Sequence, residues 1–470
     1  MDAAARKTIS ARMAEYAAGL RYEDLPADVR ELAHLVLLDT LGCALAGSTT
    51  DEVVRIRGAM AAASGGAGDA ALWGTADRLP LPLAALANGA AVHAREIDDF
   101  GGCAHSGSVV IPAALGTAAR VGASGRELLT AIVIGYDIAK RVMDGGGGYQ
   151  TIKDLGWHST GTCGGFGAAA AAGRLLGLDA KHLQWAIGYA GCNAGGTWAF
   201  IPEGAMSKRV HPGFAAQTGV MSAYLAASGV TAPESLFEAE WGGYYATYVP
   251  GKATPGRATE GLGSDFRIRL VGFKPYAACR GIHSSLDIIL ALRKTRRLQA
   301  SDVASVKVRG SRTHVKQLGK QAVQTALDAQ MSLPYSIAVA LETGGAMIDQ
   351  YTPEALRRPS VLELARRVTV THEPSVADGA EPYVDVELKN GERLTERVEI
   401  ARGDCENPLS EAELVAKFRT TAGLVFDAGH VARIERAVRD IEKSANVRPL
   451  EELMRPAAAA KKKKTTAGVA

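Results

Sequence analysis

Apolar residues in the first half of the chain recur every three to four positions, which is the period of a helix with one buried face. Between about residues 9 and 230, Gly, Pro or Asn separates such segments. The pattern predicts helices over residues 29–45, 109–121, 126–142, 164–176 and 212–228. We expect Pro212 in the first turn of the last helix, where a missing N–H costs nothing.

After Gly272 the pattern changes to short runs of alternating polarity, which are typical of β-strands. These runs cover residues 305–309, 368–371 and 383–400. The last run is interrupted at Asn390-Gly391, a strong signal for a two-residue hairpin turn. Helical periodicity returns between residue 410 and about residue 444, with Leu414, Phe418 and Val425 among the expected buried positions.

Together these patterns predict a mainly α protein, in which a large all-helical domain carries an inserted, smaller α+β domain. The expected boundaries place the helical domain at residues 1–271 and 403–455, and the α+β domain at residues 272–402. Residues 456–470 form an Ala/Lys/Thr tail, which we expect to be disordered.

Composition limits the classes of function. The chain has 470 residues, 47% of them hydrophobic, and its net charge of +3 includes the four lysines of the tail. The remainder is therefore close to neutral, which argues against a nucleic-acid partner. No charged-then-apolar leader is evident and no apolar run reaches the roughly 18 residues of a membrane span, so we expect no membrane partner. Six cysteines without paired spacing favour a cytoplasmic protein with no metal site.

Candidate chemistry is densest at residues 156–167 (GWHSTGTCGGFG), just before an alanine-rich run. Here His158 and three hydroxyl groups stand at the start of a predicted helix, whose first free N–H groups can receive an anion. The stretch predicts a corner that binds a carboxylate. The alternative is structural, with glycines that allow close helix packing and His158 as a satisfied core histidine.

Other motifs share an order and spacing with this stretch. They are residues 93–99 (HAREIDD), 105–112 (HSGSVVIP), 208–211 (KRVH), 274–276 (KPY) with His283, 332–335 (SLPY), and 407–410 (NPLS) with Lys417-Phe418. On these motifs the chain resembles the MmgE/PrpD family along nearly its whole length. That family includes 2-methylcitrate dehydratase, cis-aconitate decarboxylase and iminodisuccinate epimerase. The resemblance implies a homodimer whose smaller domain is a lid, with the active site between the two domains.

The site residues that the resemblance implies fall into two groups. The catalytic candidates are His105, His158, Lys208, His283 and Tyr335, with Asp98 and Asp99 beside them. The substrate-binding candidates are Glu96, Thr160, His211, Lys274 and Arg280.

Most catalytic candidates also have a structural alternative: a surface lysine on a helix for Lys208, a satisfied core histidine for His158, and a helix-capping histidine for His283. Lys208 is expected to pair with a substrate carboxylate, and His158 to bind a second carboxylate or shuttle a proton. His105 and His283, from different domains, are the favoured general acid and base, assembled when the domains close. Tyr335 is a carboxylate binder or proton donor, with a buried core tyrosine as its alternative. The carboxylates Asp98 and Asp99 are either orienting groups for the histidines or ordinary acids at a helix end.

The chain departs from the family pattern at two positions. Where members have Asp-Phe/Tyr-Asp-Asp-Thr, this chain has Glu96-Ile-Asp98-Asp99-Phe100. One carboxylate is therefore longer by a methylene, and a hydroxyl has become an aromatic ring. We expect these changes, together with Gly101-Gly102, to alter the choice of substrate.

The resemblance implies a lyase that acts on a small di- or tricarboxylate through a carbanion beside a carboxylate, and the histidines and lysines of the chain suit that chemistry without a cofactor or metal. A hydro-lyase of the 2-methylcitrate dehydratase type is the main expectation. The alternatives are a cis-aconitate decarboxylase, a dicarboxylate epimerase, and a catalytically silent dimer that only binds carboxylates. A nucleic-acid or membrane tether built on the lysine tail is disfavoured, because the tail lacks aromatic residues and an amphipathic helix.

Overall fold

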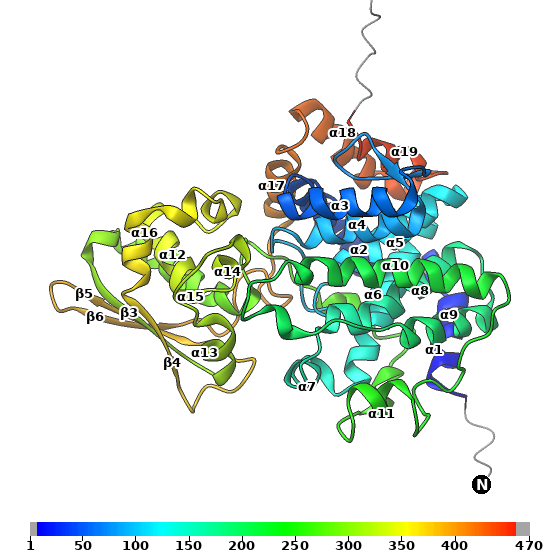
Figure 1. Ribbon diagram of the computed structural model, residues 1–470, viewed down its shortest axis with the longest axis horizontal. Helices are drawn as coiled ribbons and strands as arrows, with labels where there is room; N and C mark the ends of the chain where they lie inside the picture. The colour runs from blue at the N-terminus through cyan, green and yellow to red at the C-terminus, as the bar shows by residue number, and fades with distance from the viewer. Residues whose placement is uncertain (1–6, 457–470) are drawn as a thin grey trace, which may run out of the picture.

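The computed structural model describes residues 7–456, which form two lobes (Figure 1). The larger lobe, called here the helical lobe, contains α1–α11 and α17–α19. Their bounds are α1 Ile9–Gly19, α2 Ala27–Ser48, α3 Asp51–Ser64, α4 Leu81–His93, α5 Gly107–Val121, α6 Gly125–Gly145, α7 Gly148–Asp154, α8 Ser159–Leu175, α9 Ala180–Cys192, α10 Ser207–Ala227, α11 Tyr244–Tyr248, α17 Glu411–Ala422, α18 Ala428–Arg439 and α19 Arg448–Leu453. A two-residue antiparallel pair, β1 Ala70–Ala71 and β2 Arg78–Leu79, also belongs to this lobe.

The smaller lobe, called here the sheet lobe, combines a four-stranded sheet with short helices (Figure 1). Its elements are α12 His283–Arg296, β3 Val303–Gly310, α13 Arg312–Leu318, α14 Ala326–Gln330, α15 Leu333–Thr343, α16 Pro359–Ala365, β4 Val368–His372, β5 Tyr383–Leu388 and β6 Arg393–Arg397. The strand order is β4-β3-β5-β6, with β3 parallel to β4 and antiparallel to β5. The alternate residues Val306 and Val308 of β3 are buried, because one face of the sheet packs against helices.

Small residues let the central helices of the helical lobe approach closely. Residues 159–173 of α8 are all buried, and α8 contacts α5, α6 and α10. A Cβ atom on Gly167 of α8 would collide with the carbonyl oxygen of Gly135 on α6. The glycines and alanines of this stretch therefore serve packing, whatever the role of the residues before it.

After the sheet lobe the chain returns to the helical lobe. Helix α17 packs against α2, and α19 packs against α5, at the top of the view in Figure 1. The protein is therefore mainly α, as the periodicity predicts. The division into domains at residues 271 and 402 and the role of the sheet lobe as a lid stay predictions, and the tail at 457–470 lies outside the described residues.

Two local predictions were wrong in detail. Pro212 lies in the second turn of α10, because the helix begins at Ser207 rather than at the proline. Two of the residues that precede it in the helix, Lys208 and Arg209, form ion pairs with Glu96. The β5–β6 turn has three loop residues instead of two: the Leu388 N–H donates to the Glu392 carbonyl, and Gly391 has a φ of +89°.

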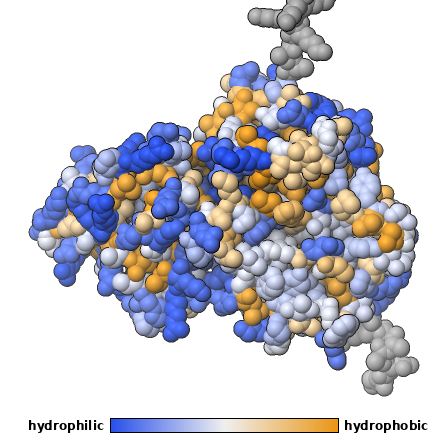
Figure 2. All heavy atoms as spheres, in the orientation of Figure 1, coloured by the Kyte–Doolittle hydropathy of each residue, from blue (hydrophilic) through white to orange (hydrophobic). Residues whose placement is uncertain are grey.

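The exposed face is mixed in polarity. In the view of Figure 2, hydrophilic side chains cover much of the sheet lobe, and apolar ones are scattered over the helical lobe. Within residues 7–456, no single helix is long and apolar enough to cross a membrane; only α2 and α3 taken together pass that test, and they are bent by 87°.

A pair of glycine substitutions tests the close packing of α8. We expect Gly167→Ala to lower the free energy of unfolding by about 2 kcal/mol, because the added methyl group collides with the backbone of α6. The control is Gly58→Ala in α3, where a Cβ meets nothing within 4 Å and should raise the free energy by up to about 1 kcal/mol. Urea unfolding measures both; equal stability of the two variants would contradict the packing described here.

Candidate active site

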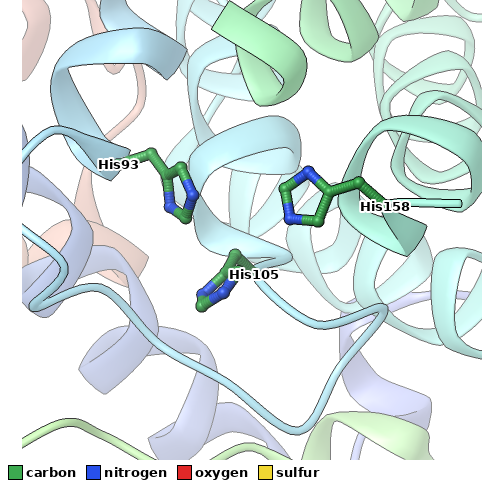
Figure 3. Close-up of side chains that lie close together, drawn as sticks. All are labelled: His93, His105 and His158. Carbon is green, nitrogen blue, oxygen red and sulfur yellow. The ribbon is translucent and has the colours of Figure 1, made fainter. Parts of the chain in front are cut away.

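Three imidazole rings converge on one point in the helical lobe (Figure 3). His93 is the last residue of α4, His105 lies in the loop before α5, and His158 directly precedes α8. One ring nitrogen from each lies within 4.8 Å of the others. His93 and His158 are buried, whereas the side chain of His105 is 14% exposed. Residues far apart in the sequence therefore form a compact cluster of titratable groups.

The loop between α4 and α5 sets the tautomers of two of these rings. Nδ1 of His93 donates to the Oδ2 atom of Asp98 over 2.7 Å, and Nδ1 of His105 donates to the backbone carbonyl of Asp99, also over 2.7 Å. Because a carboxylate and a carbonyl only accept hydrogen bonds, both rings carry a proton on Nδ1. In the neutral rings, Nε2 is therefore the nitrogen with a free lone pair.

A buried carboxylate gathers the cations of the site. Glu96 accepts from the side chains of Lys208 and Arg209, and its Oε2 lies 3.3 Å from Nζ of Lys274. Its backbone has a φ of +53°, an uncommon conformation for a residue with a side chain. Burial by itself raises the pKa of Glu96, but the charges of Lys208 and Lys274 outweigh burial and hold it well below the usual value.

The histidines of the cluster are neutral near pH 7. Burial lowers the pKa of His105 to about 3, although the charge of Asp98 opposes this change. Burial also lowers the pKa values of His93 and His158, and the positive charge of Lys208 lowers both further. The rings therefore act as uncharged groups in a positively charged setting, until a nearby anion changes the balance.

Two rings of the cluster, His105 and His158, line a cavity of about 510 Å³ between the two lobes. Six of the predicted site residues line this cavity: Glu96, His105, His158, Lys208, Lys274 and Arg280. Lys153 and Arg257 also line it, and neither forms an ion pair with a carboxylate of residues 7–456. Phe100 contributes an aromatic ring, and the Arg280 guanidinium lies over this ring at 5.2 Å from its centroid. The cavity thus offers cations and imidazoles to an anionic ligand.

Two other predicted residues lie just behind this wall. His211, on α10, bonds to His158 through their Nδ1 atoms over 3.1 Å. The carboxylate of Asp99 accepts the N–H of Gly107 at the first turn of α5. Burial raises the pKa of Asp99 well above its usual value, and the adjacent charge of Asp98 raises it further. Asp99 thus caps a helix.

Three predicted residues lie away from the cavity wall. The hydroxyl of Tyr335 donates to the backbone carbonyl of Gln350 inside the sheet lobe, over 2.7 Å. Nε2 of His283 donates to the carbonyl of Ala278. The ring that faces His105 is that of His93, with ring centroids 4.6 Å apart, and not that of His283. Thr160 is buried, and its hydroxyl has no partner within residues 7–456. Their expected catalytic or binding roles stay predictions.

Sequence reasoning did not select His93 or Arg209. His93 stands five residues before Asp98 at the end of an apolar helix, a spacing that brings a ring and a carboxylate together. Arg209 directly follows the candidate Lys208, and it also donates to the side chain of Gln330 in the sheet lobe. Lys417 supports the same loop from α17, since it contacts Asp39 at 2.7 Å and the carbonyl of Ile97 at 2.5 Å.

Buried neutral imidazoles beside paired ammonium groups can transfer protons to and from an anionic ligand. Comparison with known proteins identifies the family to which the chain belongs. A family model described as the MmgE/PrpD N-terminal domain matches residues 11–255, and one described as the MmgE/PrpD C-terminal domain matches residues 276–443. The chain belongs to the MmgE/PrpD family, which confirms the resemblance seen in its motifs.

Curated relatives are similar over nearly the whole chain. A cis-aconitate decarboxylase of Aspergillus terreus (strain NIH 2624 / FGSC A1156) is 29% identical over 480 residues, covering 96% of this chain and 97% of that protein. A cis-aconitate decarboxylase-like protein of Aspergillus oryzae is 30% identical, covering 96% of this chain and 98% of that protein. The cis-aconitate decarboxylase of Homo sapiens is 27% identical, covering 93% of this chain and 92% of that protein.

The depressed pKa of His105 predicts a loss of stability in acid. Below the unfolded pKa of about 6.5 the unfolded chain binds a proton at this residue, whereas the folded protein does so only near pH 3. Between pH 7 and pH 5 this difference costs about 2 kcal/mol of the free energy of unfolding. We expect the fall in the free energy of unfolding between pH 7 and pH 5 to be smaller by about 2 kcal/mol in His105→Asn than in wild type. The asparagine keeps a donor toward the Asp99 carbonyl. The surface variant His182→Asn is the control, and an unchanged fall in His105→Asn would contradict the prediction.

Proposed function

We propose that this protein is a lyase that needs no cofactor and that decarboxylates the tricarboxylate cis-aconitate. The observation that carries the proposal is the convergence of neutral imidazoles and buried ammonium groups on one wall of the cavity between the lobes. The names of the relatives favour decarboxylation. The main sequence-based expectation, a 2-methylcitrate dehydratase, therefore has less support than its decarboxylase alternative.

The chemistry of this decarboxylation matches the residues. In cis-aconitate one carboxylate sits on a CH2 group beside the C=C bond. When its C–C bond breaks, CO2 leaves and the released electron pair forms a new C=C bond. The former double-bond pair then moves to the carbon beside a retained carboxylate, where it takes up one proton to give itaconate. The site must hold carboxylates, stabilise the carbanion and supply that proton.

Lys208 and Lys274 are the proposed carboxylate holders. Both contact Glu96, and Lys274 also lies 3.5 Å from Asp98. A substrate carboxylate entering beside Lys208 leaves Glu96 paired with Arg209 and Lys274. The charge of Glu96 therefore stays compensated when the substrate binds.

His158 is the proposed proton donor, with His105 as a second acid or base. Burial and the charge of Lys208 hold the pKa of His158 well below its usual value, so the ring is neutral and carries one N–H. This N–H is the proton that the carbanion takes up. Phe100, where the family pattern has threonine, makes the adjoining wall apolar and is the proposed cause of any altered substrate preference.

The spacing of His93, His105 and His158 also suits a metal ion. We favour acid–base roles for these rings, because the charges of Lys208 and Lys274 face them and would repel a divalent cation. Activity is expected to survive treatment with a chelator. The homodimer and the cytoplasmic location stay predictions; light scattering tests the first.

Proton NMR in D2O tests the reaction directly. Chelator-treated protein is mixed in turn with cis-aconitate, citrate and 2-methylcitrate, and we expect itaconate from cis-aconitate with one deuterium on the CH2 group beside a carboxylate. A new alkene from 2-methylcitrate would instead identify a dehydratase. Exchange of deuterium without net conversion would indicate an epimerase, and binding without any reaction would indicate a silent binder.

Three variants separate the site residues from the fold. We expect Lys208→Met to raise KM for cis-aconitate about 10- to 100-fold, because one charged hydrogen bond to a carboxylate is lost. His158→Ala should lower kcat about 100-fold or more, because the proton donor is removed. Tyr189→Phe in α9 is the control and should stay within about twofold of wild type, since its hydroxyl donates to the carbonyl of Thr231 away from the cavity. Wild-type kinetics in both site variants would refute these roles.

A further inference from the structure

His158 lies between two separate hollows of the protein. On one side it lines the cavity between the lobes. On the other side its ring contacts His211, which lines a pocket of about 280 Å³ on the outer side of α8 and α10. His158 is 1% exposed, whereas His211 is partly exposed. The two rings therefore bridge the wall between the inner cavity and the outer pocket.

The hydrogen bond between the two rings determines which nitrogen of each ring carries the proton. Nδ1 of His158 lies 3.1 Å from Nδ1 of His211, so one atom donates and the other accepts. When His211 donates, His158 keeps its own proton on Nε2, which is the ring nitrogen left to face the inner cavity. His211 has no second hydrogen-bond partner within residues 7–456, which leaves its Nε2 available to water in the outer pocket.

Resting on the proposed decarboxylase function, we propose that His211 relays protons from the outer pocket to His158. The Nε2 proton of His158 passes to the substrate carbanion, and the Nδ1 proton of His211 passes to Nδ1 of His158. Water in the outer pocket gives a proton to Nε2 of His211 and is left as hydroxide. One C–H bond forms, and neither ring gains a net charge. After CO2 and product leave, water in the inner cavity protonates Nε2 of His158, the Nδ1 proton of His158 returns to Nδ1 of His211, and the Nε2 proton of His211 neutralises the hydroxide in the outer pocket. The one hydroxide that remains, in the inner cavity, is the base equivalent that decarboxylation releases.

The surroundings of the two rings disfavour a positively charged imidazolium. They therefore favour a proton transfer in which both rings stay neutral and only their tautomers change. His158 faces His93, His105 and Lys208, and burial together with these neighbours holds its pKa well below the ordinary value. His211 faces His93 and Lys208, and its pKa is lowered to about 4, chiefly by burial. A substrate that fills the inner cavity also separates His158 from water on that side, so the outer pocket is the remaining route for a proton.

The local backbone keeps this route open. The His158 N–H donates to the carbonyl of Gly196, which sets the ring of His158 beside the 195–196 loop. A Cβ atom on Gly196 would lie 3.3 Å from the His211 ring, and one on Gly161 would collide with the carbonyl of Gly195. Larger residues here would crowd the relay ring and the floor of the outer pocket.

Two substitutions of His211 separate a relay from a purely orienting contact. His211→Asn keeps an N–H donor toward Nδ1 of His158 but cannot pass a proton on. His211→Ala removes the donor and opens space for a small base in the outer pocket. We expect both variants to lower kcat for cis-aconitate about 10- to 100-fold with KM within about twofold of wild type. Thr218→Ala, on the same pocket wall, is the control and should keep wild-type kcat.

Imidazole added to the assay is the decisive probe. It should restore kcat of His211→Ala with a saturable dependence on its concentration, and it should not restore His211→Asn or His158→Ala. A wild-type kcat in His211→Asn would show that His211 only orients the ring and would overturn the relay, as would failure of imidazole to rescue a folded His211→Ala. If His211→Ala does not fold, kcat of His211→Asn decides. A wild-type protein inactive on cis-aconitate overturns the proposed function and the relay together; an active one with unaffected variants overturns the relay alone.

Discussion

The buried charge of Glu96 is the constraint on which the site depends. An unpaired carboxylate in the interior costs several kcal/mol, so its partners Lys208, Arg209 and Lys274 must stay in place. These partners come from α10 and from the segment that leads into the sheet lobe. One ion-pair cluster therefore sets the position of the α4–α5 loop, the start of α10 and the base of the cavity.

The histidine cluster is held by the same loop. Asp98 bonds to His93, and the Asp99 carbonyl accepts from His105, while Lys417 supports the loop from α17 through the carbonyl of Ile97. Glu96 and Ala104, at the two ends of this loop, both have positive φ values. The packing that surrounds the loop maintains these uncommon backbone conformations, and the rings are oriented as a result.

The cavity combines charges from both lobes. Gln330 of the sheet lobe accepts from Arg209 and donates to the carbonyl of Arg95, which ties that lobe to the wall that carries the imidazoles. Arg280 is neutralised by Glu381 and Asp404, whereas Lys153 and Arg257 have no carboxylate partner within residues 7–456. The polyanionic substrate that we propose would supply the negative charge that this wall lacks.

The sequence alone indicated that the chain is mainly helical, that strands follow Gly272 and that the chain resembles the MmgE/PrpD family, because hydrophobic periodicity and short motifs are local properties of the chain. It also identified six residues of the cavity wall, including Lys208 and His158. Only the tertiary structure decided that His93 faces His105 and that Tyr335 points into the sheet lobe. The physical reason is distance along the chain: which side chains meet depends on how closely α4, α8 and α10 pack, and helical periodicity does not encode that packing.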